Sequence, residues 1–246
     1  KFSMQAWQLY ALATGFAAWY VGSAVWVVRG RVVAVRPGRR WLAWTLGPAA
    51  ALLFAASLVF VVSGTPARQS ERFADLGWGL DGFAYLGAAT YREPARPGSG
   101  EGEVELVLAE DAVLFAWLRE NVEGSPVIAE MVGPLYRWTG RVAMHTGLPA
   151  VIGWDWHQVQ QRRPYEDLVR QRRADTELFF TMADPLMAER YLRKYNVSYV
   201  VWGTEERARA NPDVRAMLEG LEAVEVVFVD GESAVLRVDQ GRLGLR

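Results

Sequence analysis

The chain has no cysteine and only two histidines among its 246 residues. The absence of cysteine excludes disulfides and thiolate metal sites. The histidines, His145 and His157, lack the H-x-x-x-H spacing of a metal site, and no phosphate-binding glycine loop or G-x-S-x-G nucleophile motif is present. We therefore expect no metal and no cofactor. A net charge of −1 gives no bulk attraction to nucleic acid, so we expect no nucleic-acid partner.

Charge is missing from two long stretches near the N-terminus. No charged residue occurs in 2–28 or in 41–67. Each stretch exceeds the ~20 apolar residues that cross a bilayer core. Two buried core helices are the alternative, but such helices are seldom this long without a charge. The pattern predicts that residues 1–67 form two transmembrane helices, at about 4–28 and 42–63.

Five arginines and no acid lie between the two apolar stretches, in the sequence "RGRVVAVRPGRR". Short arginine-rich loops stay in the cytoplasm, so both ends of the chain should face outward. We expect a multi-pass protein of the cell membrane with an extracytoplasmic C-terminal domain. Because the chain begins at Lys1 without methionine, we expect it to be the tail of a longer protein, with membrane lipid and upstream transmembrane helices as its partners. The arginines are Arg29, Arg31, Arg36, Arg39 and Arg40.

Residues 68–104 are predicted to be an interfacial segment followed by a mobile loop. The loop is the Pro/Gly/Glu-rich sequence "REPARPGSGEGEVE". Aromatic rings are favoured at the level of lipid headgroups. The rings expected there are Trp78, Phe83, Tyr85 and Tyr91.

Residues 105–246 are predicted to form a soluble α/β domain with a mixed sheet and a C-terminal hairpin. Helices alternate with strands, as in α/β folds, and Asp230-Gly231 is a strong hairpin signal. We expect helices from Glu110 and over 164–180, 184–195 and 205–218. Strands are expected at 126–131, 141–147, 149–154 and 197–203.

A dense group of planar and hydrogen-bonding side chains occurs in "GLPAVIGWDWHQVQQRR", residues 147–163. Ligands bind at the carboxyl ends of strands in α/β sheets, and the polar group follows the strand expected at 149–154. We expect Trp154, His157, Gln161 and Arg162 to line one pocket. A polar cap on an ordinary strand is an equally good reading of the composition, and a docking surface is the third. The candidate substrate-binding residues are Trp154, Trp156, His157, Gln158, Gln161 and Arg162.

An arginine run continues from this stretch into the next helix. One interpretation is a solvated helix face paired with Glu166 and Asp167. The other is contact with lipid headgroups or a phosphate, which suits the planar guanidinium. The run consists of Arg162, Arg163, Arg170, Arg172 and Arg173.

Several segments resemble, in order and spacing, the C-terminal portion of the Chlor_Arch_YYY integral membrane proteins. They are "TLGPAA", "SGTPAR", "LDGFAYL", "GRVAMHTGLPAVIGWDWHQVQQR" and "YLRKYNVSYVVWGTEER", and together they cover nearly the whole chain. The family pattern has glutamate where this chain has Gln158, which removes a possible acid or base. The YYYxG motif is absent, in keeping with a C-terminal portion. The matching positions are Gly147, Leu148, Pro149, Val151, Gly153, Trp154, His157, Gln160, Gln161 and Arg162.

This family is similar to GT-C-type glycosyltransferases, multi-helix membrane enzymes that take sugars from polyprenyl-phosphate donors. The resemblance implies a lipid-linked sugar as substrate and a catalytic carboxylate upstream of this chain. The outer domain would then assist substrate binding. A non-enzymatic binding or assembly module of a membrane complex is the alternative.

The expected topology is tested by cysteine labelling, since the chain has no cysteine of its own. Ser99→Cys should react with an impermeant thiol reagent on intact cells, and Val33→Cys should not, because the arginine-rich loop should be cytoplasmic. Permeabilised cells, in which both variants should react, are the control. Labelling in the reverse pattern would overturn the orientation.

Overall fold

The computed structural model describes residues 2–22, 26–28, 31–34, 40–69, 79–96, 98–100 and 102–244. The chain divides into two compact units, Lys1–Arg72 and Phe73–Arg246. Some residues on which the sequence predictions depend lie outside the described ranges, namely Arg29, Arg36, Arg39 and Trp78.

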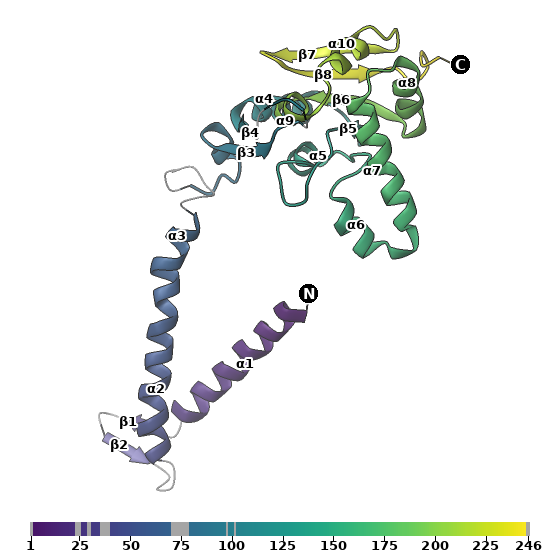
Figure 1. Ribbon diagram of the computed structural model, residues 1–246. Coiled ribbons are helices and arrows are strands. Elements are labelled where there is room, and N and C mark those ends of the chain that lie inside the picture. The colour runs from purple at the N-terminus through teal and green to yellow at the C-terminus, as the bar shows by residue number, and fades with distance from the viewer. Residues whose placement is uncertain are drawn as a thin grey trace. The chain divides into compact units, whose positions relative to one another are not determined.

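The first unit contains helices and a small hairpin (Figure 1). Helix α1 ends at Gly22, and residues 26–28 form a strand, so the helix expected at 4–28 is wrong in its last residues. Valine-rich sequence explains the change, because β-branched side chains favour strands. The elements are α1 (Phe2–Gly22), the antiparallel pair β1 (Trp26–Val28) and β2 (Arg31–Ala34), then α2 (Arg40–Val59), the π-helical η2 (Phe60–Gly64) and α3 (Thr65–Gln69).

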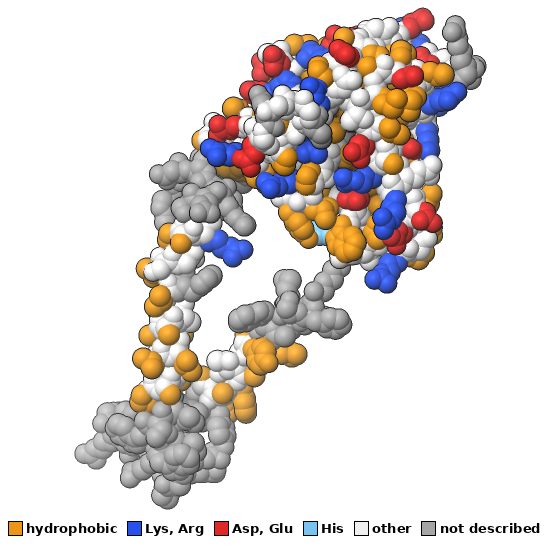
Figure 2. Space-filling model, viewed as in Figure 1, with side chains coloured by type: hydrophobic (Ala, Val, Ile, Leu, Met, Phe, Trp, Pro, Cys, Tyr) orange, Lys and Arg blue, Asp and Glu red, His pale blue; other side chains and the backbone are white. Residues whose placement is uncertain are grey.

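One helix in the described part of the chain, Gly47–Arg68, is long and apolar enough to cross a membrane. Its mean hydropathy is 1.9 and none of it is buried, and Figure 2 shows apolar side chains along it. The span expected at 42–63 therefore has a matching helix. The span expected at 4–28 is not confirmed, and the multi-pass topology stays a prediction.

The second unit is built on a four-stranded sheet in the order β5-β6-β8-β7. Strands β5 (Val127–Ala129) and β6 (Val197–Trp202) are parallel. Strands β8 (Ser233–Val238) and β7 (Val224–Asp230) add antiparallel pairs, and Gly231 turns between them with φ 56°. The predicted α/β class, the mixed sheet and the C-terminal hairpin are confirmed.

Alternate residues of the strands face two different cores. Val200 and Trp202 of β6 pack with residues of α7, α8 and α10, whereas Val201 packs with residues of α4. Helices therefore cover both faces of the sheet, as the period of two along a strand requires. These helices are α4 (Leu108–Asn121), α7 (Glu166–Thr181), α8 (Pro185–Lys194) and α10 (Asp213–Glu219).

Part of the segment predicted to lie at the membrane interface packs against the second unit. Tyr85 lies in η3 (Ala84–Gly87), and its hydroxyl is 2.8 Å from Nε2 of His145. Tyr91 lies in β3 (Thr90–Pro94), which pairs with β4 (Glu103–Val107), so both ends of the expected loop are strands. Both rings are partly buried against the core of this unit, and their placement at headgroup level stays a prediction.

Three further predictions of secondary structure are wrong. Residues 141–147 form helix α5 (Arg141–Thr146) in place of a strand, because left-handed glycines stand at both of its ends. The strand expected at 149–154 is reduced to one parallel bridge between Ala150 and Ile128. The helix expected at 205–218 is divided into α9 (Thr204–Arg209) and α10, because Pro212 disfavours helical backbone at the residue before it.

Candidate functional site

The stretch 147–163 leaves the core and becomes a short helix. Val151 and Ile152 are buried, and helix α6 (Asp155–Gln161) follows Trp154. A turn of 3₁₀ helix, η4 (Arg163–Tyr165), joins α6 to α7. The polar side chains of this stretch therefore leave from several faces of one helix and not from the end of a strand.

Trp154 and His157 belong to an aromatic group with Tyr136. The Tyr136 ring lies 5.1 Å from Trp154 and 5.2 Å from His157, and its hydroxyl is 2.8 Å from Nε2 of His157. Nε1 of Trp154 donates to the carbonyl of Thr139 at 3.0 Å. Tyr136 has φ 60°, a left-handed conformation that is uncommon for a bulky residue. The ring contacts hold this loop against α6.

A pocket of about 480 Å³ is lined by residues of α6, η4, α7 and α8 together with two residues next to these helices. This volume is within the range of small-molecule sites. It combines three cations, two tyrosines and two glutamines with an apolar floor. The lining residues are Gln158, Arg162, Tyr165, Leu168, Val169, Gln171, Arg172, Lys194 and Tyr195.

The three cations of this pocket differ in how they are held. Nη1 of Arg172 donates to the carbonyl of Val151 at 3.2 Å, and Lys194 pairs with Asp175 at 2.6 Å. The guanidinium of Arg162 has no hydrogen-bond or ion-pair partner among the residues that the structure describes. An anion entering the pocket would meet a free guanidinium, which is the strongest kind of hydrogen-bond donor for phosphate or carboxylate.

The rest of the arginine run is partly paired. Arg170 forms an ion pair with Glu166, and Arg173 pairs with Asp155 at 3.1 Å. The paired, solvated helix face therefore describes these two arginines. Arg163 is exposed and, like Arg162, has no side-chain partner within the described ranges.

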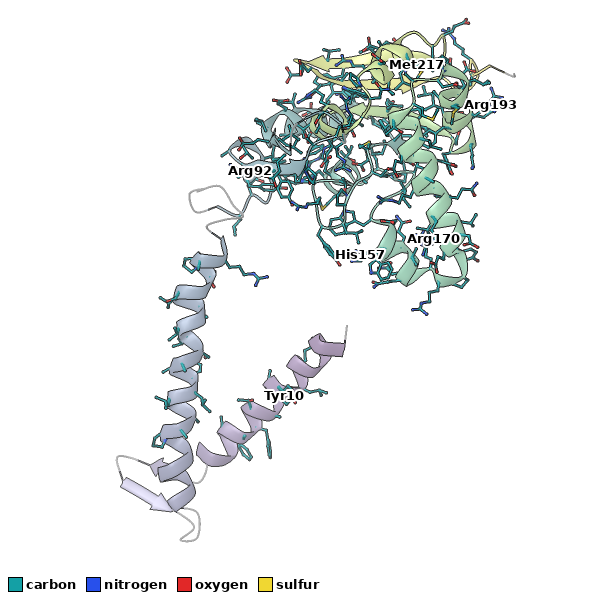
Figure 3. All side chains as sticks on the ribbon, in the orientation of Figure 1. Tyr10, Arg92, His157, Arg170, Arg193 and Met217 are labelled. Carbon is teal, nitrogen blue, oxygen red and sulfur yellow. The ribbon has the colours of Figure 1, made fainter. Side chains whose placement is uncertain are left out.

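The predicted site residues separate into groups. Gln158 and Arg162 line the pocket, whereas Trp154 and His157 join the group around Tyr136. Trp154, His157 and Gln161 do not line this pocket with Arg162, and neighbouring residues of a helix point about 100° apart, so the single pocket expected for these side chains is not confirmed. Figure 3 shows His157 on α6 and Arg170 on the neighbouring helix α7. Trp156 and Gln161 are exposed, and ligand binding by all six residues stays a prediction.

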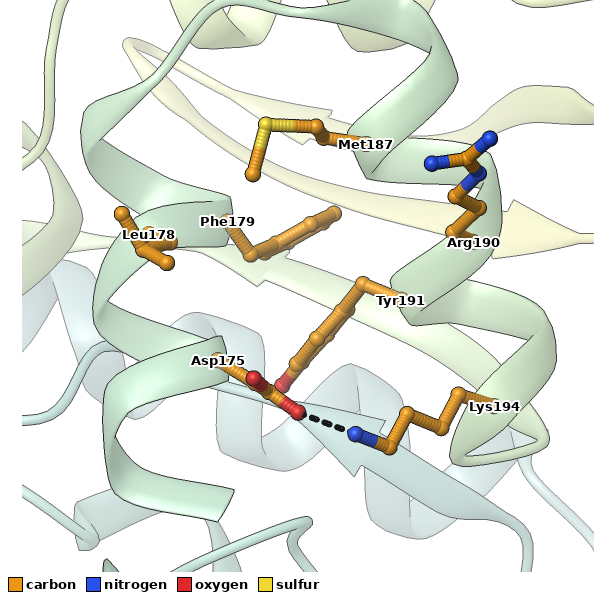
Figure 4. A pocket seen from close by; sticks show the side chains of 7 residues that line it. All are labelled: Asp175, Leu178, Phe179, Met187, Arg190, Tyr191 and Lys194. Atoms are coloured by element: carbon orange, nitrogen blue, oxygen red, sulfur yellow. Dashed lines mark hydrogen bonds and ion pairs between the residues drawn. The ribbon is translucent and has the colours of Figure 1, made fainter. Parts of the chain in front are cut away.

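A second pocket, of about 210 Å³, lies between α7 and α8 (Figure 4). The rings of Phe179 and Tyr191 stack at 4.3 Å on its floor. Lys194 lines both pockets and keeps its ion pair with Asp175 in this one. The wall is mostly apolar, so this pocket favours an apolar group over an anion.

A buried ion network, centred on Arg141 and missed by the sequence analysis, lies behind the loop that carries Tyr136. Arg141 is fully buried, and its guanidinium donates to Asp111 at 2.6 Å and to Glu206 at 2.6 Å. Asp111 also accepts from Nε1 of Trp138 at 2.7 Å, and Glu206 from the Met131 amide at 2.7 Å. The network therefore joins α4, α5 and α9 to both ends of that loop.

The carboxylate of Asp111, which is bound to Arg141, is held ionised. Burial alone would raise the pKa of Asp111, but Arg141 and Thr204 keep that pKa below its ordinary value. Burial alone would lower the pKa of Arg141, but Asp111 and Glu206 keep it well above its ordinary value. Asp111 and Glu206 thus share one cation, which leaves less compensation for the other buried carboxyl groups; Nη1 of Arg141 is 4.0 Å from Glu130.

Two further buried carboxyl groups, those of Glu130 and Glu205, have raised pKa values. Burial raises the pKa of Glu130 from 4.5 to about 7, although Arg141 and the amides of Val142 and Ala143 oppose the shift. Burial, with Glu93 and Glu206 nearby, raises the pKa of Glu205 to about 8. Neither oxygen of Glu205 has a hydrogen-bond partner in the described part of the chain. Glu205 is therefore mostly protonated at neutral pH.

A sequence signal for this network exists. Glu130 directly follows β5, and Glu205 and Glu206 come soon after β6, at the carboxyl ends of the two parallel strands. Ligands in α/β proteins bind at the carboxyl ends of parallel strands. Applied to β5 and β6, this rule would have pointed to these three glutamates. Here the edge is filled by Arg141 of the chain itself.

Among the described residues, no group of three or more His, Cys, Asp or Glu side chains has an arrangement that could hold a metal ion. Comparison of the chain with protein-family models and with curated proteins found no match.

Gly203 tests the tightness of the network. A Cβ at this position would lie 2.4 Å from Oδ1 of Asp111 and 2.7 Å from Nη2 of Arg141. We expect Gly203→Ala to lower the free energy of unfolding by about 1–3 kcal/mol, as overpacking does. This free energy is measured by urea denaturation of the full chain in detergent, with tryptophan fluorescence as the signal. Gly87→Ala is the control, since nothing lies within 4 Å of its Cβ, and equal stability of both variants would contradict the prediction.

The raised pKa values predict how stability depends on pH. A carboxyl whose pKa is higher in the folded state binds its proton more tightly there, so stability falls as pH rises from its ordinary pKa of 4.5 through about 7 for Glu130 and about 8 for Glu205. Each group contributes a slope of up to about 1.4 kcal/mol per pH unit. Urea denaturation between about pH 5 and 9 should show this decline.

Two variants test whether the fall in stability with rising pH comes from Glu205. Glu205→Gln should remove the part of the slope nearest pH 8, because the amide is neutral throughout. Glu225→Gln is the control, since Glu225 pairs with Arg237 on the surface. Stability that stays constant or rises over this range would show that the buried carboxyls are ionised.

Proposed function

We propose that the second unit binds a phosphate-bearing, lipid-linked ligand in the pocket between α6, α7 and α8. One observation carries the proposal: Arg162 presents a free guanidinium in a pocket of about 480 Å³ that also contains Arg172 and Lys194. A phosphate can accept charge-assisted hydrogen bonds from all three groups. Gln158 and Arg162 of the predicted site thereby receive a common role.

The remainder of the lining supports a ligand with a ring or hydroxyl groups beside its phosphate. Tyr165 and Tyr195 offer flat faces, while Gln158 and Gln171 both donate and accept hydrogen bonds. Leu168 and Val169 supply apolar contacts suited to part of a lipid chain. A lipid-linked sugar phosphate combines these three chemistries in one molecule.

Binding, and not bond cleavage, is the task that this pocket supports. Its described lining contains no carboxylate, so no acidic side chain is placed to act as general acid or base there. The chain would accordingly be the C-terminal, membrane-anchored part of a GT-C-like glycosyltransferase. Its catalytic carboxylate would lie upstream, as the family resemblance implies, and the second unit would help to hold donor or acceptor.

A membrane location is supported by the helix Gly47–Arg68. The extracytoplasmic position of the second unit is part of the proposal and follows from the arginine-rich sequence between the apolar stretches. On that side of the membrane the pocket would meet lipid-linked sugars.

A non-enzymatic binding or assembly module is the second candidate. The apolar pocket between α7 and α8 favours it, because Leu178 is exposed where it lines this pocket with the stacked rings of Phe179 and Tyr191. Such a surface suits an apolar partner segment. It offers no recognition of phosphate, so the two candidates differ in the chemistry of the ligand.

The proposal is tested with geranyl phosphate and calorimetry of the full chain in detergent. Arg162→Ala should raise Kd about 10–100-fold, the equivalent of the ~1.5–3 kcal/mol of one charge-assisted hydrogen bond. Arg162→Lys should lose less, because lysine keeps the charge but not the planar fork. Thermal unfolding should be unchanged in both variants, since Arg162 is exposed.

The controls separate phosphate recognition from partition into the detergent. Geraniol lacks the phosphate and should bind no more tightly to the wild type than to Arg162→Ala. Arg237→Ala removes the same charge from β8, where Arg237 pairs with Glu225 at 2.6 Å, and should leave Kd unchanged. Equal binding of geraniol and geranyl phosphate, or equal weakening by Arg237→Ala, would refute the phosphate site.

A further inference from the structure

Residues 155–170 form a projection on the second unit, here called the α6–α7 projection. It consists of α6, η4 and the first turns of α7. Figures 1 and 3 show α6 and this end of α7 extending side by side away from the four-stranded sheet. Only Val169 among its residues is buried, so packing against the domain accounts for little of its composition.

Three large apolar side chains of the projection face solvent. Trp156 is 51% exposed, Tyr165 60% and Leu168 55%. Scattered exposed apolar residues are ordinary, but here three belong to one short helical corner. Their exposure contributes nothing to folding and indicates a contact made outside the domain.

Two unpaired arginines accompany these side chains. Arg162 and Arg163 lie between Trp156 and Tyr165, and neither guanidinium has a partner within the described ranges. Arg170, one turn into α7, is neutralised by Glu166. Both unpaired arginines therefore lie at the turn that also carries Tyr165, and the exposed acid Asp167 follows that turn.

We propose that the α6–α7 projection rests on the surface of a bilayer that contains anionic lipid. Trp156, Tyr165 and Leu168 enter the boundary between headgroups and acyl chains, and Arg162 and Arg163 pair with lipid phosphates. Aromatic rings with a polar edge and arginines with long apolar stems are the side chains that this boundary favours.

Charge favours an anionic lipid surface as the occupant. Such a surface supplies the opposite charge for Arg162 and Arg163, which have no side-chain partner within the described ranges. A second copy of the chain would bring Asp167, an exposed acid of the same projection, but also two further unpaired arginines. The lipid surface is therefore the partner whose charge complements this pair of arginines.

The chain also contains a helix that could anchor it in a bilayer. Helix Gly47–Arg68 is apolar enough to span one, and about ten residues follow it before the described part of the second unit begins. Because the second unit is covalently joined to this helix, it stays near the same membrane, which favours repeated contact through a high effective concentration.

The test uses single cysteines, which the native chain lacks, labelled with bimane. Full-length Trp156→Cys and Leu168→Cys are reconstituted in nanodiscs that contain about one-third anionic lipid and a spin-labelled quencher near the headgroups. Val229→Cys on β7, 54% exposed, is the control for an exposed site away from the projection. We expect emission at 156 and 168 to shift to the blue and to be quenched at least about twofold more than at 229.

The arginines are tested in the Trp156→Cys background. Arg163→Ala, which leaves the pocket lining intact, should reduce quenching in anionic discs, and so should high salt. Equal quenching at 156, 168 and 229 would overturn the proposal. So would a blue shift that depends on protein density at constant lipid, because it would reveal contact between copies.

The outcome does not depend on the proposed phosphate pocket. The pocket is assayed in detergent with Arg162 variants, whereas the membrane contact is assayed at Trp156, Leu168 and Arg163. Loss of geranyl phosphate binding with intact quenching would refute the pocket alone. Intact binding without quenching would refute the membrane contact alone.

Discussion

One buried cation, Arg141, organises the second unit. Its guanidinium holds Asp111 of α4 and Glu206 of α9. At the two ends of the intervening loop, Glu206 accepts a hydrogen bond from the backbone amide of Met131 and Asp111 accepts one from the indole of Trp138. Removing one partner of such a buried pair costs about 3–5 kcal/mol, because the remaining charges lose their compensation. The position of the loop that carries Tyr136, and through it of α6, therefore depends on an interaction deep inside the unit.

This network occupies the edge of the sheet where α/β proteins ordinarily bind ligands. The carboxyl ends of β5 and β6 lead to Glu130 and to Glu205 with Glu206, and Arg141 fills the space between them. The larger pocket is formed instead by helices on one side of the unit. A binding surface made by α6, α7 and α8 leaves the closed sheet edge free to stabilise the fold.

The fold could be predicted from sequence where local pattern and tertiary packing agree. Strand β6 is a mostly apolar run in which four of the six residues are buried, and Asp230-Gly231 marks the terminal hairpin. The prediction of a strand at 141–147 was wrong because the alternation of Val142 and Met144 resembles that of a strand. The deciding feature is the left-handed backbone at Gly140 and Gly147. The pairing of Arg141 with acids far away in the sequence could not be predicted, because the periodicity of a segment gives no information about distant contacts.

Two of the nine residues that line the larger pocket were predicted as substrate-binding residues, and the geometry of the pocket was not predicted. Pattern placed the polar group at 154–162, and the structure brings Gln158 and Arg162 into one pocket. The helical period then sends Trp156 to solvent and His157 toward Tyr136. A strand would have put alternate residues on one face, whereas a helix distributes them around its axis. One short helix can therefore combine a ligand pocket, a contact with the buried network's loop and an exposed aromatic ring suited to a lipid surface.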